Sequence, residues 1–383
     1  MVKIKKSTIY IIPATVIVGL IAVFMLFPPS YEPPERDLRD EVQFMLFEKI
    51  GWYLFDDSTR WMITYGAQNG LTINHFNPLD RGYLTPKQAS LWEWKERNKP
   101  LVREITFQKD SLSNITGFAW DDQNGKNHTA SKINEYGYGL SQVEFYNHDV
   151  KIVATLMKPF TQGPHPAVVL IHGSGVSDRD NLWYLYIADN LARNGIAVLF
   201  PDKRGCGQSE GKWHVAGFND FANDAIAGIE YLASLENINS HKIGLLGVSQ
   251  GGWIAPLASD KSDDIDFVIN LSGSMTTPNK QIAHEVRADV NNAGLPEFLA
   301  SIMAPIFTER AKNKRKIWWK KNGGFEVIKY WKSIAVPALI VYGRKDENDN
   351  VPVNTSESLL KQHGSDKTTL MIYEDSGHAL EDP

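Results

Sequence analysis

Three patterns of hydrophobic and polar positions follow one another along the chain. An uncharged apolar run from Ile9 to Phe27 comes first. From Gly51, short apolar segments rich in aromatic and β-branched residues alternate with turn signals such as Asn69-Gly70. From Gln142 onward, short apolar runs alternate with segments of helical periodicity. The middle pattern predicts short antiparallel strands, and the last one predicts alternating strands and helices.

Residues 1–30 are predicted to lie outside the globular fold. Lys3, Lys5 and Lys6 precede the first apolar run, whose length is at the limit of about 20 residues that a membrane-spanning helix needs. The run is longer than most signal-peptide cores, and no cleavage motif of small residues follows Leu20. We therefore expect a retained anchor, with its lysines cytoplasmic and the rest of the chain in a periplasm or outside. The alternative is a cleaved signal and secretion of the soluble chain.

Residues 31–140 are predicted to form a β-rich accessory domain. A stiff proline-rich linker, Pro28 to Pro34, leads into it, and Leu38–Ile50 has the spacing of a short helix. Regular short strands indicate an antiparallel meander or a small barrel. Thr85–Gln88 also fits a helix capping box, which would make Ser90–Arg97 helical, but we favour a strand there. The expected strands are Trp52–Phe55, Arg60–Tyr65, Leu71–Phe76, Leu91–Trp94, Arg103–Gln108 and Ile115–Trp120.

Residues 141–383 are predicted to form an α/β domain with a mainly parallel sheet covered by helices on both faces. A hairpin of Gln142–Tyr146 and Val150–Lys158 opens it. The segment 272–337 interrupts the alternation, is rich in helix formers and lies between two strands, so we expect a lid. The expected strands are Ala167–Ile171, Ala197–Phe200, Lys242–Leu246, Phe267–Leu271, Ala338–Tyr342 and Thr369–Tyr373, and the helices are Leu182–Arg193, Phe218–Leu235, Gln250–Ala258 and Val353–Gln362.

Composition removes several classes of function. The 383 residues carry a net charge of −5, which does not favour a nucleic-acid partner. The single cysteine, Cys206, excludes a disulfide framework within the chain and a cysteine-based metal cluster. We expect no cofactor and no metal.

The segment from Lys242 to Gly251 contains a candidate serine nucleophile. The strand Lys242–Leu246 ends in Gly247-Val-Ser-Gln-Gly251, which fits G-x-S-x-G. This pattern predicts a nucleophile elbow, a strained strand-to-helix turn that lifts the Ser249 hydroxyl above the sheet. Gly247 and Gly251 leave room where a side chain would collide. On its own the motif also fits an ordinary strand-to-helix turn, so the choice between the two depends on whether the other catalytic groups are present in the chain.

The remaining catalytic groups fall in the order that an elbow serine requires, which is serine, acid, histidine. Asp346 follows the strand Ala338–Tyr342 and a glycine, with Asp349 as the rival acid, and His378 follows the last strand. A lone loop aspartate or histidine is usually structural, but this order at successive strand ends predicts a triad. The backbone amides of Ser174 and Gln250 are the expected oxyanion hole.

These motifs resemble those of the bacterial α/β-hydrolase serine esterases, near the dienelactone-hydrolase and prolyl-oligopeptidase-like branches. The resemblance covers Gln142 to His378 and implies an α/β-hydrolase fold and ester hydrolysis through an acyl-enzyme. Dienelactone hydrolases proper use a cysteine nucleophile where this chain has Ser249. The motifs are His172-Gly-Ser-Gly175, Ser177-Asp-Arg-Asp180, Pro201–Gly211, Gly247–Gly251, Gly343–Asp346 and Gly377-His378.

Two departures from that family's pattern stand out. The loop from Asp346 to Val351 is longer than usual, which keeps Asp349 open as the acid. The chain stops at Pro383, where the family has a last helix, so the helix is absent or the sequence is truncated. Separately, Ile105–Asp110 with Ile115–Trp120 resembles the end of small lipocalin-like β-domains appended to some bacterial serine hydrolases. That resemblance implies an accessory domain without catalytic residues.

Three functions are compatible with these observations. The first is an extracytoplasmic carboxylesterase acting on a small ester or acyl substrate. The second is a serine peptidase or acyl-peptide hydrolase, although the segment after the linker is too short for the large β-propeller that such peptidases often carry. The third is a non-catalytic binding module, against which the complete set of Ser249, Asp346 and His378 argues. The acyl group, the leaving group and the oligomeric state stay open.

We predict that Ile9–Phe27 is a retained helix, because it can span a bilayer and lacks a cleavage motif. Membrane fractionation should find the chain in the membrane pellet, and amino-terminal sequencing should begin before Lys3. A mature chain that begins after Phe27 and is wholly soluble would contradict the anchor.

Overall fold

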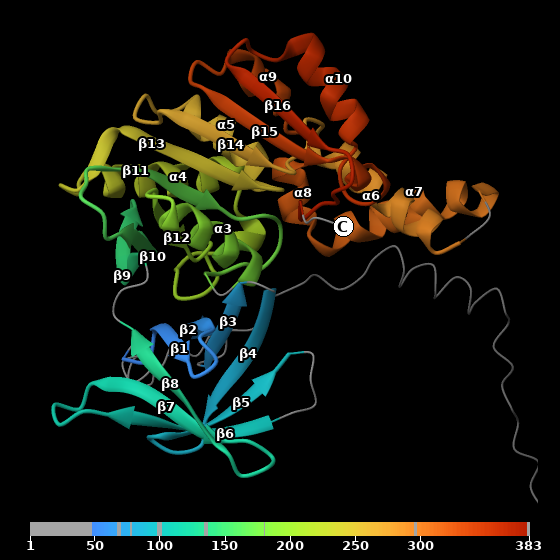
Figure 1. The fold of residues 1–383 in the computed structure, drawn as a ribbon. Coiled ribbons are helices and arrows are strands. Elements are labelled where there is room, and N and C mark those ends of the chain that lie inside the picture. The colour runs from blue at the N-terminus through green and yellow to red at the C-terminus, as the bar shows by residue number, and fades with distance from the viewer. Residues whose placement is uncertain are drawn as a thin grey trace, which may run out of the picture.

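A computed structural model describes residues 48–66, 70–76, 79–97, 102–133, 137–179, 181–294 and 297–380. The expected anchor Ile9–Phe27 and the proline-rich linker lie outside the described residues, as does nearly all of the expected helix Leu38–Ile50. Within the part of the chain that is described, no helix is long and apolar enough to cross a membrane. Figure 1 shows a barrel below a larger domain in which helices cover a sheet.

The amino-terminal domain is a closed barrel in which each strand pairs antiparallel with the next along the chain, and β8 returns to β1. Of the two predicted arrangements, an antiparallel meander and a small barrel, the structure has the barrel, and its closure pairs both edges of every strand from β1 to β8. The strands are β1 (Gly51–Phe55), β2 (Arg60–Gly66), β3 (Gly70–Phe76), β4 (Leu79–Pro86), β5 (Leu91–Glu96), β6 (Val102–Lys109), β7 (Ile115–Asp121) and β8 (Asn127–Ile133).

Aromatic side chains fill the barrel. Phe118 is fully buried and contacts the rings of Tyr53, Phe55 and Trp94, among others. Strand alternation puts these residues inside, since successive side chains point to opposite faces. Leu91–Glu96 is a strand as expected, and not a helix.

Two barrel strands were not predicted. The strand β4 carries Asp80, Arg81 and Gly82, which break the apolar pattern, and β8 contributes only Ala130 to the buried apolar core. Both form because barrel closure supplies backbone partners on either side, which a single-strand pattern does not reveal. Gly82 is required for close packing, since an added Cβ would lie 2.2 Å from Nε1 of Trp94.

The second domain is built on a sheet with the order β16-β15-β14-β13-β11-β12-β10-β9. The strands from β11 to β16 run parallel, whereas β9 and β10 form the predicted antiparallel hairpin at one edge. The strands are β9 (Tyr138–Asn147), β10 (Val150–Pro159), β11 (His165–Ile171), β12 (Ala197–Pro201), β13 (Ile238–Val248), β14 (Phe267–Leu271), β15 (Ala338–Gly343) and β16 (Thr368–Tyr373).

Helices cover both faces of this sheet, as predicted. Helix α3 (Leu182–Arg193) packs on the face that also meets the barrel. The opposite face buries residues of α4 (Phe218–Ala233), α5 (Gly251–Ser259) and α10 (Val353–His363).

Tyr138 joins the two domains. Its buried hydroxyl donates a hydrogen bond to Asp189 of α3 at 2.8 Å, and its ring packs edge-on against Trp52 of the barrel. Trp52, Met62 and Phe76 of the barrel share one apolar cluster with α3 and the sheet. The barrel therefore packs on the sheet domain through a continuous apolar contact.

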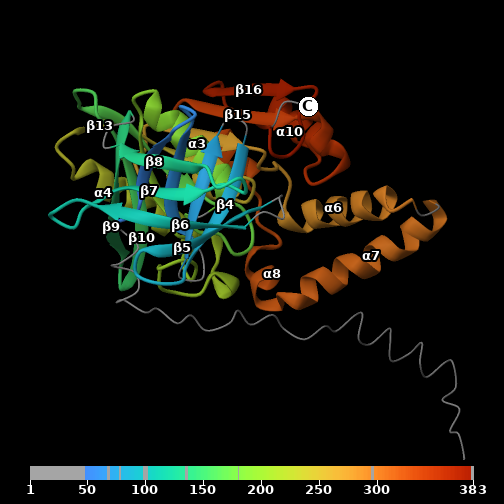
Figure 2. The same ribbon diagram turned by 60° about the horizontal axis from the view of Figure 1, so that its bottom comes forward.

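The insertion between β14 and β15 is helical: α6 (Pro278–Asn292), α7 (Glu297–Lys314), α8 (Lys316–Asn322) and α9 (Ile328–Ser333). Its second half packs back on the domain, where Trp318 and Trp331 enter the main core. Figure 2 shows α6 and α7 projecting from the domain as a pair. That pair is held by a small apolar cluster of its own, which includes Val286, Val290 and Ala304.

Candidate active site

Ser249 occupies the turn between β13 and α5. Its φ of 51° lies in the left-handed region, which costs an ordinary side chain energy and is tolerated where surrounding structure enforces it. The enforcing contacts are tight: a Cβ on Gly247 would lie 2.2 Å from the Gly251 carbonyl oxygen, and a Cβ on Gly251 would lie 2.4 Å from that of Ile171. The turn therefore has the geometry of a nucleophile elbow.

The structure brings His378 and Asp346 together. Nδ1 of His378 lies 2.7 Å from Oδ2 of Asp346, whose side chain is fully buried in the 3₁₀ turn η2 (Arg344–Asn348) after β15. The amides of Asn350 and Val351 donate to the other carboxylate oxygen at 3.1 and 3.2 Å. The loop from Asp346 to Val351 thus wraps around the Asp346 carboxylate.

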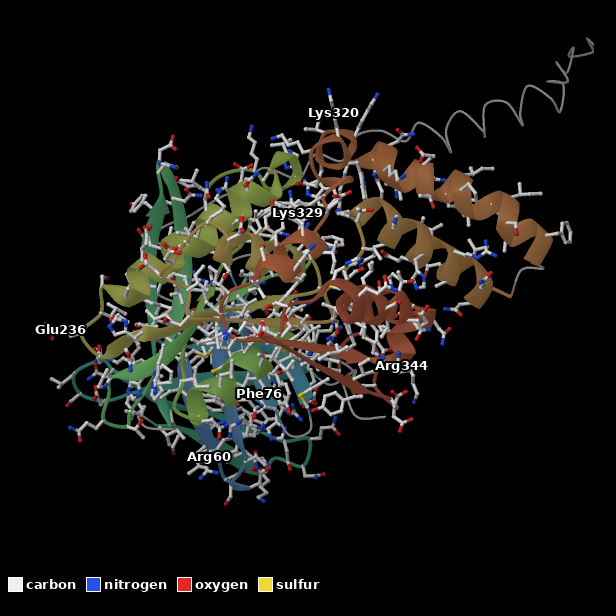
Figure 3. The ribbon with its side chains drawn as sticks, turned by 90° about the horizontal axis from the view of Figure 1, so that it is seen from above. Arg60, Phe76, Glu236, Lys320, Lys329 and Arg344 are labelled. Carbon is white, nitrogen blue, oxygen red and sulfur yellow. The ribbon has the colours of Figure 1, made fainter. Side chains whose placement is uncertain are left out.

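Asp349, the rival acid, lies at the end of the same turn. Its backbone N–H donates to the Asp346 carbonyl oxygen. Arg344, at the start of the turn, is held to α10 by Asn354 at 3.0 Å and Glu357 at 2.9 Å, and Figure 3 shows it beside that helix. The turn is therefore braced on both sides.

The end of β14 connects the serine to the histidine. The N–H of Ser249 donates to the Leu271 carbonyl oxygen at 2.8 Å. The next residue, Ser272, donates through its hydroxyl to the His378 carbonyl oxygen at 2.8 Å. The backbones of the nucleophile candidate and the base candidate are thus attached to adjacent residues.

The hydrogen bond to Asp346 determines the tautomer of His378. A carboxylate accepts, so Nδ1 carries the proton and Nε2 is left able to accept one. Burial alone would lower the pKa of His378, but the hydrogen bond and charge of Asp346 outweigh it and raise that pKa above its ordinary value. The negative charges of Asp349 and Glu285 add to the rise.

Glu285 belongs to the projecting helix α6, and the sequence analysis did not single it out. Its own pKa is raised by burial and by the neighbouring charge of Asp289, while His378 acts in the opposite direction. The same helix touches the acid turn, since Asn292 donates to the Asn348 carbonyl oxygen at 3.1 Å. The sequence offered no signal for it, because a glutamate on a helix usually faces solvent.

The loop His172–Gly175 lies beside the elbow. A Cβ on Gly173 would lie 3.4 Å from that of Ser249, and the Gly173 N–H donates to the Tyr184 hydroxyl at 2.8 Å. Among the residues that the structure describes, no protein acceptor engages the N–H groups of Ser174 and Gln250. Both amides therefore have the freedom to donate to an oxyanion.

His172 is a structural residue of this loop. Its Nε2 donates to the Pro201 carbonyl oxygen, and its Nδ1 accepts from the Ser177 hydroxyl at 2.8 Å. Burial lowers its pKa to about 3, so the ring is neutral. Both ring nitrogens are occupied, so His172 does not compete with His378 as base.

The Asp202–Gly211 loop braces the site through Asp202. This buried carboxylate accepts from the backbone amides of Arg179 and Gln208 at 2.9 and 2.7 Å. Arg204, in the same loop, pairs with Asp224 of α4. Over the described ranges, no group of three or more His, Cys, Asp or Glu side chains is arranged to hold a metal ion.

The sheet order, the helices on both faces and the elbow together define the class of fold: the chain has the α/β-hydrolase fold. Residues 162–317 match the family described as serine aminopeptidase, S33.

The chain is also similar to several known proteins. The chain is 25% identical to the AB hydrolase superfamily protein YisY of Bacillus subtilis over 238 residues, covering 55% of this chain and 84% of the relative. It is 25% identical to the esterase EstD of Thermotoga maritima over 246 residues, covering 58% of this chain and 56% of EstD. The structure of the Pyrococcus furiosus esterase Pf2001 aligns with a TM-score of 0.48 at 24% identity, covering 63% of this chain and 84% of that one.

We predict that Asp346 and not Asp349 orients His378. Asp346→Asn keeps the size of the side chain but removes the charge that holds the working tautomer, so it should lower kcat by about 10⁴. Asp349→Asn, the matched control in the same turn, should cause a small loss. A larger loss in Asp349→Asn, measured under the same conditions, would reverse the assignment.

The pH profile should report the charges around His378. The base must be neutral to accept a proton, so kcat/KM should fall as pH drops through its raised pKa. Glu285→Gln removes one charge that raises this pKa, so the acid limb should move to lower pH. Glu326→Gln, an exposed glutamate of the insertion, should leave the limb in place. A limb unmoved in Glu285→Gln, or moved to higher pH, would show that Glu285 does not act on His378.

Proposed function

We propose that this α/β hydrolase cleaves carboxylic esters through an acyl-enzyme. The observation that carries the proposal is the strained Ser249 turn, joined through the end of β14 to a histidine that is bonded to a buried carboxylate. This is the nucleophile, base and orienting-acid arrangement of acyl transfer.

The steps follow from the groups present. Ser249 Oγ attacks the ester carbonyl carbon while Nε2 of His378 takes the hydroxyl proton. The oxyanion that forms accepts hydrogen bonds from the Ser174 and Gln250 amides. Collapse expels the alcohol, which receives the proton from His378. Water, deprotonated by the same histidine, then releases the acid and restores Ser249.

An ester is favoured over a peptide by the motifs that resemble bacterial esterases and by the similarity to EstD, which is named an esterase. The second candidate, a serine peptidase, is supported by the description of the matching family as serine aminopeptidase. The accessory domain is a small barrel, which differs from the propeller that encloses the site in many such peptidases. A non-catalytic binding module is least favoured, because the histidine and acid are paired as catalysis requires.

We also propose that the catalytic domain works outside the cytoplasm, attached to the membrane by Ile9–Phe27, on a small ester or acyl substrate. The support is the length and charge pattern of that segment. The α6 and α7 pair, beside the acid turn, is the candidate lid over that substrate.

We predict that Ser249 is the acylated residue. The detergent-solubilised full chain should react with a fluorophosphonate and should hydrolyse nitrophenyl esters faster than aminoacyl anilides. Ser249→Ala should abolish labelling and lower kcat by about 10⁶, as loss of a triad nucleophile does. The control is Ser240→Ala, an exposed serine on β13.

Two results would count against this proposal. Labelling of Ser249→Ala at near wild-type rate would show that the nucleophile lies elsewhere. Faster turnover of anilides than of esters would favour the peptidase.

A further inference from the structure

Lys203 is a buried lysine two residues beyond β12, and the proposed reaction assigns it no role. Only 6% of its surface is exposed. Its ammonium group donates to the carbonyl oxygens of Gly173 at 2.8 Å and Gly175 at 3.1 Å, and to Oε1 of Gln250 at 2.9 Å. A lysine ammonium has three N–H donors, so all of them are used.

These acceptors belong to the two halves of the expected oxyanion hole. Gly173 and Gly175 flank Ser174, which supplies one amide, and Gln250 supplies the other. We propose that Lys203 is a positioning residue that holds both amide donors of the oxyanion hole through one buried ammonium group. The inference rests on the proposed acyl-transfer function.

Peptide geometry shows how such a contact would act. The Gly173 carbonyl and the Ser174 N–H belong to the same trans peptide unit, in which C=O and N–H point in opposite directions. When Lys203 holds the carbonyl on one side, the Ser174 N–H is directed to the other. The positive charge behind the carbonyl also polarises the peptide, so the N–H becomes a stronger donor.

The lysine is costly to bury, which argues for a specific purpose. Burial lowers the pKa of Lys203 to about 8; Cys206 of its own loop opposes the change, and the charge of Arg315 from the helical insertion adds to it. His172, on the adjoining loop, is neutral. The rings of Phe221 and Trp213 lie 5.0 and 5.8 Å from the ammonium and offer weak compensation.

The pH dependence has a definite sign. The folded-state pKa is lowered, so Lys203 is charged below about pH 8 and loses its proton above it. A neutral amine has one donor fewer and no charge, so kcat should fall on the alkaline side. This limb is separate from the acid limb that His378 controls.

The test replaces the lysine in the full chain. Lys203→Met keeps the apolar stem but removes every donor. We expect kcat to fall about 100-fold, the effect of losing an oxyanion donor, with KM little changed. A boronic acid inhibitor, whose tetrahedral adduct places an oxygen in the oxyanion hole, should bind about 100-fold more weakly. The alkaline limb near pH 8 should disappear.

A second buried lysine provides the matched control. Lys49 of the barrel region is 1% exposed and lies over the rings of Trp92 and Phe107, in the other domain. Lys49→Met should lower thermal stability while kcat and boronate affinity of the folded protein stay at wild-type values. Thermal unfolding of both variants separates loss of folding from loss of catalysis.

The outcomes distinguish this inference from the function on which it rests. If Ser249→Ala is inactive but Lys203→Met keeps kcat and boronate affinity within about threefold of wild type, well short of a lost donor, the positioning role is wrong and the esterase stands. If Lys203→Met does not fold, Gln250→Met cuts one of the three contacts and should lower kcat and boronate affinity together.

Discussion

The catalytic domain depends on one strained residue, Ser249, whose backbone is held in the left-handed region. Its N–H is bound by the end of β14, and its flanking glycines pack against the helix below and the neighbouring strand. The contacts of the Ser249 N–H and of Gly251 reach the strands β14 and β11, so the turn depends on three strands being in register. This conformation places the Ser249 hydroxyl at the sheet edge where the loops carrying the proposed base and the proposed oxyanion donors converge.

Buried charged side chains hold the loops of the candidate site in place. Asp346, Asp202 and Lys203 are all withdrawn from water, and each is surrounded by backbone groups of the opposite polarity. Burying such a charge is costly, and moving one of its hydrogen-bond partners would leave it unpaired. The loops that carry these partners therefore tolerate little movement. The loops after β11, β12 and β15 are thus held by polar contacts at points where apolar packing alone would allow them to move.

The barrel is stabilised by apolar packing, both in its interior and where it meets the sheet domain. Its aromatic interior is complete in itself, yet Trp52, Met62 and Phe76 face outward and pack with α3 beneath the sheet. At this junction the buried hydroxyl of Tyr138 donates a hydrogen bond to Asp189. The two domains therefore share one apolar cluster, and the α6 and α7 pair projects from the sheet domain while α6 contacts the acid turn through Asn292.

Local patterns in the sequence were sufficient for the elements of the α/β domain, because apolar runs and helical periodicity reflect burial directly. They also located Ser249, Asp346 and His378 at strand ends, since parallel strands bring their carboxyl ends to one edge. Local patterns could not decide between Asp346 and Asp349, which lie three residues apart on one turn; the fold of that turn directs only Asp346 to the histidine ring. The strands β4 and β8, the position of Glu285 and the three contacts of Lys203 arise from partners distant in the chain, and so only the tertiary structure determined them.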